Sequence, residues 1–294
     1  MSKNCGTNEV SAAARIRGNI GKRIGSLWVW DGVPGLFTTR RRSEAFGRVL
    51  LMTAMNAVEE YMNPLLAGDR VGCRTILQSK LAELNDPTAL YQELLWPAVE
   101  RVEKLYRGDR INIAVEHMAT RINRAIADQL QAHLPKQAPT GKKVLITCAD
   151  GEPEELGAQM CADLFESRGW SVYFLGGGVP NDEVLSLVGQ LTPDLLLVFG
   201  TQPGGVPGVR RLVDLIREIG VNPTMNIMVS GGVFNRAEGL WKEVSADLIA
   251  KTANQALELA ENAHPRIPVP PKNTGVKKRR RRRRSVDPAA SESA

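Results

Sequence analysis

Acidic, hydroxyl and glycine residues gather in four loops in the second half of the chain, each directly after an apolar run. The first loop, 150–157, reads DGEPEELG and carries three glutamates. The later loops read GGGVP (176–180), GTQPGG (200–205) and SGG (230–232). Glycine lets the backbone approach a ligand closely and adopt a positive φ. These loops are therefore candidate ligand-binding segments, although ordinary turns between strands and helices have a similar composition.

The common phosphate-binding and nucleophile motifs do not match these loops. A dinucleotide site needs G-x-G-x-x-G after the first strand, whereas 150–157 places acidic groups where a pyrophosphate needs backbone donors. The chain has no Walker A lysine loop, and no serine or cysteine stands in a nucleophile elbow. The sequence therefore disfavours NAD or FAD binding and predicts no catalytic constellation of an autonomous enzyme.

A parallel sheet would bring the four loops to one place. Short β-rich runs alternate with helical segments within 143–263, and the runs lie at 144–150, 171–176, 194–200, 226–232 and 247–250. This alternation predicts an α/β domain with a doubly wound, five-stranded parallel sheet and right-handed crossovers. Ligands bind such sheets outside the carboxyl ends of the strands, which is where the loops fall.

An all-α region precedes this domain. Residues 44–133 contain no strand-like alternation and predict a four-helix bundle with helices at about 44–66, 69–84, 87–107 and 111–133. The predicted apolar face of the last helix consists of Ile111, Val115, Met118, Ile122, Ala125 and Leu130, and His117 lies off this face. Residues 134–142 hold two prolines, which cannot continue a helix, and we interpret them as a linker.

Four motifs, taken in order, carry a resemblance to a known family. Nine residues separate Tyr106 from Glu116-His117, which resembles a W-x9-E-H signature, and segment 152–157 resembles D/E-x-H-x-x-G. The pair Gly231-Gly232 resembles a family glycine pair, and 246–260 resembles a closing strand and helix. The bundle and sheet together resemble the cobalamin (B12)-binding module, a four-helix cap followed by a flavodoxin-like domain. This module occurs in methionine synthase, corrinoid methyl carriers and cobalamin-dependent photoreceptor regulators.

The resemblance implies a cobalamin site between the cap and the sheet edge. Its cofactor contacts would be Tyr106, Glu116, His117, Glu152, Glu154, Gly157, Thr201, Ser230, Gly231 and Gly232, with the glycine pair admitting the nucleotide tail. His117 is the candidate upper axial cobalt ligand, or alternatively a solvated side chain. Glu154 replaces the histidine that gives the family its lower cobalt ligand, and a carboxylate is a harder and weaker donor than imidazole. Cobalamin bound here would lack a histidine ligand from this loop. An alternative interpretation is that Glu154 only helps to start a helix.

Basic residues concentrate at the two ends of the 294-residue chain. The net charge of +6 divides into +6 for residues 1–43, −8 for 44–264 and +8 for 265–294. We predict a basic, partly disordered arm at 1–43 and a disordered basic tail at 264–294. The tail contains Lys277, Lys278, Arg279, Arg280, Arg281, Arg282, Arg283 and Arg284. Such a tract predicts salt-dependent, sequence-independent binding of nucleic acid, or alternatively only a solubilising role.

No apolar run approaches the ~20 residues that span a bilayer, and the N-terminus lacks the apolar region of a secretory signal. The four cysteines show no CxxC spacing, so we interpret them as reduced thiols. These features favour a cytoplasmic protein without membrane contact.

The sequence favours a sensor or regulatory protein that binds cobalamin or a related tetrapyrrole. Light or ligand state would change the contact between cap and sheet, and a transcription factor or nucleic acid would read the change. One alternative is a corrinoid methyl-carrier subunit of a methyltransferase system. A further alternative is a haem- or bilin-binding protein, or a scaffold that binds no ligand. The oligomeric state stays open, a homo-oligomer included.

Overall fold

The computed structural model describes residues 57–152 and 154–268. The predicted arm 1–43 and the arginine tract 277–284 lie outside the described residues, so nucleic-acid binding by the tract stays a prediction. Within the described part of the chain, no helix is long and apolar enough to cross a membrane.

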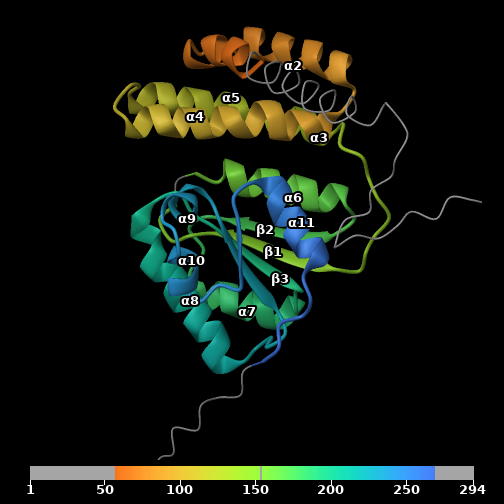
Figure 1. The fold of residues 1–294 in the computed structure, drawn as a ribbon, viewed down its shortest axis with the longest axis vertical. Helices are drawn as coiled ribbons and strands as arrows, with labels where there is room; N and C mark the ends of the chain where they lie inside the picture. Colours follow the sequence, from red (N-terminus) through yellow and green to blue (C-terminus); the bar gives the residue numbers. More distant parts are fainter. Residues whose placement is uncertain (1–56, 153, 269–294) are drawn as a thin grey trace, which may run out of the picture. The chain divides into compact units, whose positions relative to one another are not determined.

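The described N-terminal region is entirely helical. Residues 57–66 are helical and are followed by α2 (Arg70–Leu84). A continuous helical run then comprises α3 (Pro87–Leu90), the π-helical turn η1 (Tyr91–Leu95) and α4 (Trp96–Arg107), and α5 (Ile113–Gln131) completes the cap. Figure 1 shows these helices stacked in layers, with α4 and α5 on the side of the following domain.

Polar side chains set the starts of these helices. The Asp69 carboxylate accepts hydrogen bonds from the backbone N–H groups of Val71 and Gly72 at 3.1 and 2.9 Å. Asp86 caps α3, and Asn112 caps α5 by accepting from Val115 N–H at 3.0 Å. Each such cap stabilises a helix by about 1 kcal/mol.

The second region is a five-stranded parallel sheet in the order β2-β1-β3-β4-β5. Its strands are β1 (Lys143–Cys148), β2 (Ser171–Gly176), β3 (Leu195–Phe199), β4 (Asn226–Ser230) and β5 (Leu248–Ala250). Its helices are α6 (Leu156–Ser167), α7 (Asn181–Leu191), α8 (Val206–Ile219), α9 (Gly232–Arg236), α10 (Leu240–Glu243) and α11 (Ala253–Asn262), with a 3₁₀ turn η2 (Pro203–Gly205). This is the flavodoxin-like order, whose switch point lies between β1 and β3. The predicted fold class, a helical cap followed by this sheet, is confirmed.

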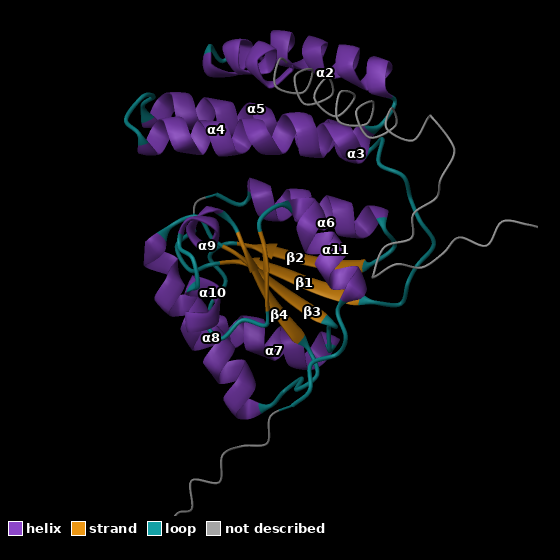
Figure 2. Ribbon diagram, in the orientation of Figure 1, coloured by secondary structure: helices purple, strands orange, loops and turns teal. Residues whose placement is uncertain are grey.

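Both faces of the inner strands β1, β3 and β4 are almost entirely buried, as expected for parallel strands. Successive residues of β3 alternate between two hydrophobic cores: Leu197 and Phe199 face the core that includes the cap, α6 and α11, whereas Val198 faces the core on the α7 and α8 side. Figure 2 shows α6 and α11 on one side of the strands and α7 on the other. The cap therefore shares one continuous core with the sheet.

Helix α5 presents a different face to the interior than the sequence predicts. Met118, placed on the predicted apolar face, has 44% of its surface exposed. Glu116 and Asn123 are buried instead, because this side of α5 faces a cavity and the cap core at once. Asn123 accepts a hydrogen bond from the buried Tyr61 hydroxyl at 2.9 Å. The apolar pattern missed these two positions because they are polar.

The cap is joined to α6 by a buried polar contact as well as by apolar packing. The Tyr91 hydroxyl lies 3.0 Å from the carbonyl oxygen of Ala127 and 2.9 Å from Oδ2 of Asp163 on α6. Burial raises the pKa of the Asp163 carboxyl to about 6. Neither Tyr91 nor Asp163 lines the predicted site.

Candidate functional site

A cavity of about 400 Å³ lies between the cap and the carboxyl ends of the strands. Its walls come from α4 and α5 of the cap and from the segments that follow β1, β3 and β4. Eight of the ten cofactor contacts predicted from the sequence line it: Tyr106, Glu116, His117, Glu154, Gly157, Thr201, Gly231 and Gly232. The volume falls within the range of small-molecule and cofactor sites.

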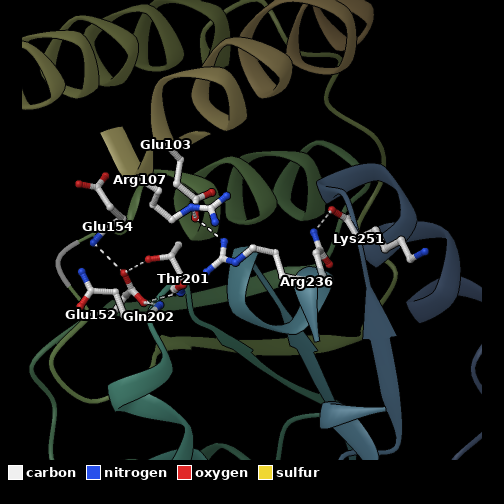
Figure 3. Close-up of polar contacts among 9 residues, drawn as sticks. Glu103, Arg107, Glu152, Glu154, Thr201, Gln202, Arg236 and Lys251 are labelled. Carbon is white, nitrogen blue, oxygen red and sulfur yellow. Dashed lines mark hydrogen bonds and ion pairs between the residues drawn. The ribbon is translucent and has the colours of Figure 1, made fainter. Parts of the chain in front are cut away.

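Glu152, the ninth predicted residue, lies behind the cavity wall. Its buried carboxylate accepts hydrogen bonds from the backbone N–H and the hydroxyl of Thr201 at 2.5 and 2.6 Å. It also accepts from the backbone N–H groups of Gln202 at 3.3 Å and Glu154 at 3.1 Å. Figure 3 shows Glu152 among these groups. Glu152 thus ties the loop after β1 to the loop after β3 and positions the wall.

Ser230, the tenth predicted residue, lies beneath the cavity and does not line it. Its side chain is fully buried, and its hydroxyl has no hydrogen-bond partner among the described residues. Ser230 pairs in register with Phe199, and neighbours in register share a face of a parallel sheet. The hydroxyl therefore faces the cap side of the sheet, next to the Phe199 ring.

Glu116 of the cap and Glu154 of the α/β domain both line the cavity, and their carboxyl groups interact. The pKa of Glu154 is raised to about 8, mainly by burial. A hydrogen bond with Glu116 of α5 and the negative charges of Glu116 and Glu152 raise it further, whereas the positive charge of Arg124 lowers it. At neutral pH Glu154 is therefore mostly protonated and donates to Glu116. Since a ligand must lose its proton to bind a metal, the raised pKa of Glu154 would oppose coordination of cobalt by this carboxyl.

The glutamates of the first loop lie just before α6, with Glu155 at the N-cap position and without a side-chain capping hydrogen bond. That helix begins at Leu156, and its first turn contains no acidic residue. Glu155 instead accepts a hydrogen bond from the Gly177 N–H at 2.7 Å and lies 3.5 Å from the Arg124 guanidinium. Glu154 lies one position before the N-cap residue Glu155 and lines the cavity, so its helix-start role and its ligand contact both stay predictions.

His117 stands at the rim of the cavity. Its side chain is 57% exposed, and Nε2 lies 3.5 Å from Oε2 of Glu116. Glu116 also accepts a hydrogen bond from the Thr120 hydroxyl at 3.0 Å. His117 is thus both solvated and oriented toward the site, and its role as an upper axial ligand stays a prediction.

An ion pair that the sequence analysis missed joins the cap to the α/β domain across the site. Arg236 of α9 contacts Glu103 of α4 at 2.5 Å and donates to the Thr201 carbonyl oxygen at 2.6 Å. Arg107 lies 3.4 Å from the same Glu103 carboxylate. Figure 3 shows Arg236 pointing at Glu103. Glu103 and Arg107 have the i,i+4 spacing of helix ion pairs, which was a usable signal, whereas no local pattern pointed to Arg236.

The raised pKa of Glu154 predicts a pH dependence of stability. The folded protein holds this proton more tightly than the unfolded chain, whose pKa is near 4.5, so folding takes up a proton between pH 4.5 and about 8. The free energy of unfolding contributed by Glu154 should therefore fall as pH rises through this window. Glu154→Gln removes the titration, and urea midpoints should then decline less between pH 6.5 and 8.

Burial raises the pKa of Asp163 only to about 6, so its titration falls below this pH interval and is distinguished from that of Glu154. Glu258→Gln, on an exposed position of α11, is the matched control and should keep the wild-type slope. An unchanged slope in Glu154→Gln would show that the carboxyl is already ionised in this interval.

Two individual proteins are similar to this chain over most of the cap and the α/β domain. Dimethylamine corrinoid protein 1 of Methanosarcina acetivorans is 21% identical over 204 residues, which cover 67% of this chain and 94% of that protein. The structure of the Methanosarcina barkeri monomethylamine corrinoid protein superposes with a TM-score of 0.64 at 16% identity. It covers 70% of this chain and 97% of that one. The structural likeness supports the fold.

These relatives correct the function predicted from the sequence. The HTH-type transcriptional repressor CarA of Myxococcus xanthus is 29% identical, but only over 89 residues, which cover 30% of this chain and 31% of the repressor. Corrinoid proteins match over about twice that length and almost end to end. The prediction of a light- or ligand-responsive sensor acting on transcription is therefore wrong, because it gave a short cap signature and a basic tail more weight than the whole module.

Family assignment rests on both halves of the described structure. A family described as B12 binding domain matches residues 142–261, which contain the sheet, and a second family with that description matches residues 57–131, which contain the cap. Together the two matches cover about two thirds of the chain, in the order cap then sheet. The chain therefore belongs to the cobalamin-binding module family, with a helical cap followed by a flavodoxin-like B12-binding domain.

Proposed function

We propose that this chain is a corrinoid methyl-carrier subunit, which binds its cofactor in the cavity between cap and sheet and presents it to methyltransferase partners. The observation that carries the proposal is the position of the cavity at the carboxyl ends of the strands, roofed by α4 and α5. Support comes from corrinoid proteins of methylamine systems, with which the chain aligns over 94% of one relative's length. The chain itself would not be an autonomous enzyme.

The cavity wall suits a corrin macrocycle, which is an apolar ring bordered by amide groups. Trp96, Val99 and Val102 of α4 offer an apolar surface. Thr120, Asn123, Gln202 and Asn235 also line the cavity and supply polar groups for the peripheral amides. The Asn235 side-chain oxygen is buried without a hydrogen-bond partner among the described residues. An unpaired buried oxygen costs free energy, and a ligand amide would satisfy it.

When bound, the cobalt centre supplies a reduced metal that accepts a methyl group and gives it up again. The residues of this chain would hold and shield that centre. The Glu152 hydrogen bonds fix the two loops beneath the ligand, and the Arg236–Glu103 pair holds the cap against the sheet edge. Tyr106 and Ile113 line the cavity and are also exposed, which marks the side from which a partner would reach the ligand.

Cofactor reconstitution tests this proposal. Purified full-length chain is mixed with hydroxocobalamin, methylcobalamin, haem or biliverdin and passed through a gel-filtration column, and the absorption spectrum of the protein peak is recorded. We expect about one corrinoid per chain and little haem or biliverdin. Protein loaded with methylcobalamin should transfer its methyl group to a thiol acceptor when a corrinoid:thiol methyltransferase is added.

Two tryptophan variants provide the control. Thr120→Trp places a large side chain in the cavity and should abolish corrinoid retention, whereas Thr75→Trp, at an exposed position of α2, should not change it. Retention of haem or biliverdin in preference to both corrinoids, or equal retention in the two variants, would refute the proposal.

A further inference from the structure

The family resemblance assigns Gly157, Gly231 and Gly232 to ligand contacts. In the structure, other groups of the protein occupy the space beside each glycine where a Cβ would lie. A Cβ added at Gly157 would lie 2.2 Å from Cζ of Phe199. A Cβ at Gly231 would lie 2.3 Å from the Gly200 carbonyl oxygen, and one at Gly232 would lie 2.5 Å from Nη1 of Arg236. Each glycine thus makes room for a neighbouring protein group, and that room is already filled.

The three protein groups that occupy the space beside these glycines differ in how easily they can move. The group over Gly231 is the backbone of the loop after β3, which the sheet fixes. The group over Gly232 is the Arg236–Glu103 ion pair, whose side chains are partly exposed. The group at Gly157 is the phenyl ring of Phe199, which is 5% exposed and lies at the carboxyl end of β3. Phe199 is therefore the side chain that closes the hollow between α6 and the sheet.

The Phe199 ring also separates the cavity from a buried polar group. The last row of side chains on the cap side of the sheet is Cys148, Phe199, Ser230 and Ala250, as the strand registers show. Phe199 lines the cavity, and Ser230 beside it does not. The Ser230 hydroxyl has no partner among the described residues. Removal of the ring would join the hollow to the cavity and give Ser230 access to a ligand.

We propose that Phe199 determines which corrinoids this chain accepts, because its ring keeps the nucleotide tail of cobalamin out of the sheet edge. This inference rests on the proposed function. A cobalamin bound with its lower base displaced needs a protein donor to replace that base and a hollow to receive it. The first loop offers Glu154 in place of a histidine, and the hollow at Gly157 is filled. The chain therefore binds corrinoids whose base stays on cobalt or is missing.

The experiment compares two corrinoids that differ in the nucleotide tail. Hydroxocobalamin carries the tail, and diaquacobinamide lacks it. Dissociation constants are measured by titration of the full-length protein, and absorption spectra report whether the base of bound cobalamin stays on cobalt. For the wild type we expect dissociation constants within about threefold of each other and a base-on spectrum.

Variants of the ring test the cause. Phe199→Ala should lower the dissociation constant of cobalamin, taken relative to that of cobinamide, at least tenfold compared with the wild type. Adding Ser230→Ala should reverse part of the gain. Phe165→Ala is the matched control, since it removes a fully buried ring of α6 in the same core that does not line the cavity, and it should leave the ratio of the two constants unchanged.

The wild type alone can overturn the inference, so the test survives a variant that does not fold. Cobalamin bound base-off and at least tenfold more tightly than cobinamide would show that the ring moves aside. An unchanged ratio in folded Phe199→Ala, or in Phe199→Leu if the alanine variant does not fold, would show that the ring is not the determinant. Failure to retain either corrinoid is a separate outcome that refutes the proposed function and this inference with it.

Discussion

Replacing Glu152 with alanine should lower the free energy of unfolding by about 2–4 kcal/mol, because a buried carboxylate that accepts several hydrogen bonds would be lost. Its four donors belong to three residues, Glu154, Thr201 and Gln202. The N–H groups of Glu154 and Thr201 lie in partly buried surroundings, where water replaces the carboxylate incompletely. Urea denaturation of the two proteins at pH 7 measures this loss.

A graded set of variants locates the source of the Glu152 effect. Thr201→Val removes one donor, the hydroxyl 2.6 Å from Oε1 of Glu152, and should cost about 1 kcal/mol. The effects of Glu152→Ala and Thr201→Val should not add, since both break the same contact. Corrinoid retention should fall in Glu152→Ala even where the protein stays folded, because the cavity loops lose their common anchor. A loss below 1 kcal/mol for Glu152→Ala would show that water or a neighbour replaces the carboxylate.

Alanine at Gly231 should be at least as damaging, with an expected loss of about 3–5 kcal/mol. This glycine has φ 101° and ψ 170°, a region that side chains avoid at a cost of about 1–3 kcal/mol. The added Cβ would also meet the Gly200 carbonyl oxygen at 2.3 Å. Overpacking against groups that cannot move costs a further 1–3 kcal/mol or so. Thermal or urea unfolding of the purified variant measures the sum.

Gly239 separates these two contributions. It also has a positive φ, 84°, but a Cβ there would meet nothing within 4 Å. Gly239→Ala should therefore cost only the backbone term, about 1–2 kcal/mol. If the two variants lose the same stability, the contact between Gly231 and Gly200 contributes nothing, and the turn after β4 can shift to accept a side chain.

The fold and most of the cavity wall could be predicted from the sequence for one physical reason. Parallel strands bring their carboxyl ends to the same edge, so the loops after β1, β3 and β4 converge on the cavity. The helical patterns of the cap were equally visible in the sequence. Eight predicted residues therefore line one cavity, although Tyr106 and Gly232 are far apart in the chain.

The remaining site residues could not be predicted because their roles arise only in the folded chain. Arg236 and Glu103 pair across 133 positions, and no local spacing relates them. Phe199 reads as an ordinary apolar residue at the end of a strand. Its importance comes from facing Gly157 on another element. The burial of Glu116 and Asn123 was hidden for a different reason, since buried polar residues on α5 contradict the apolar pattern from which a buried face is predicted.

The core shared by the cap and the sheet constrains how the module can move. Side chains of the cap such as Ile126 and Leu130 belong to the same buried cluster as Phe165 of α6 and Leu197 of β3. Lifting the cap away would expose this cluster to water at roughly 25 cal/mol for each Å² of apolar surface. The cap and the α/β domain are thus expected to unfold as one cooperative unit and not as two independent domains. Opening of the cavity by a small sliding of the cap along α6 would therefore cost less free energy than separation of the cap from the sheet.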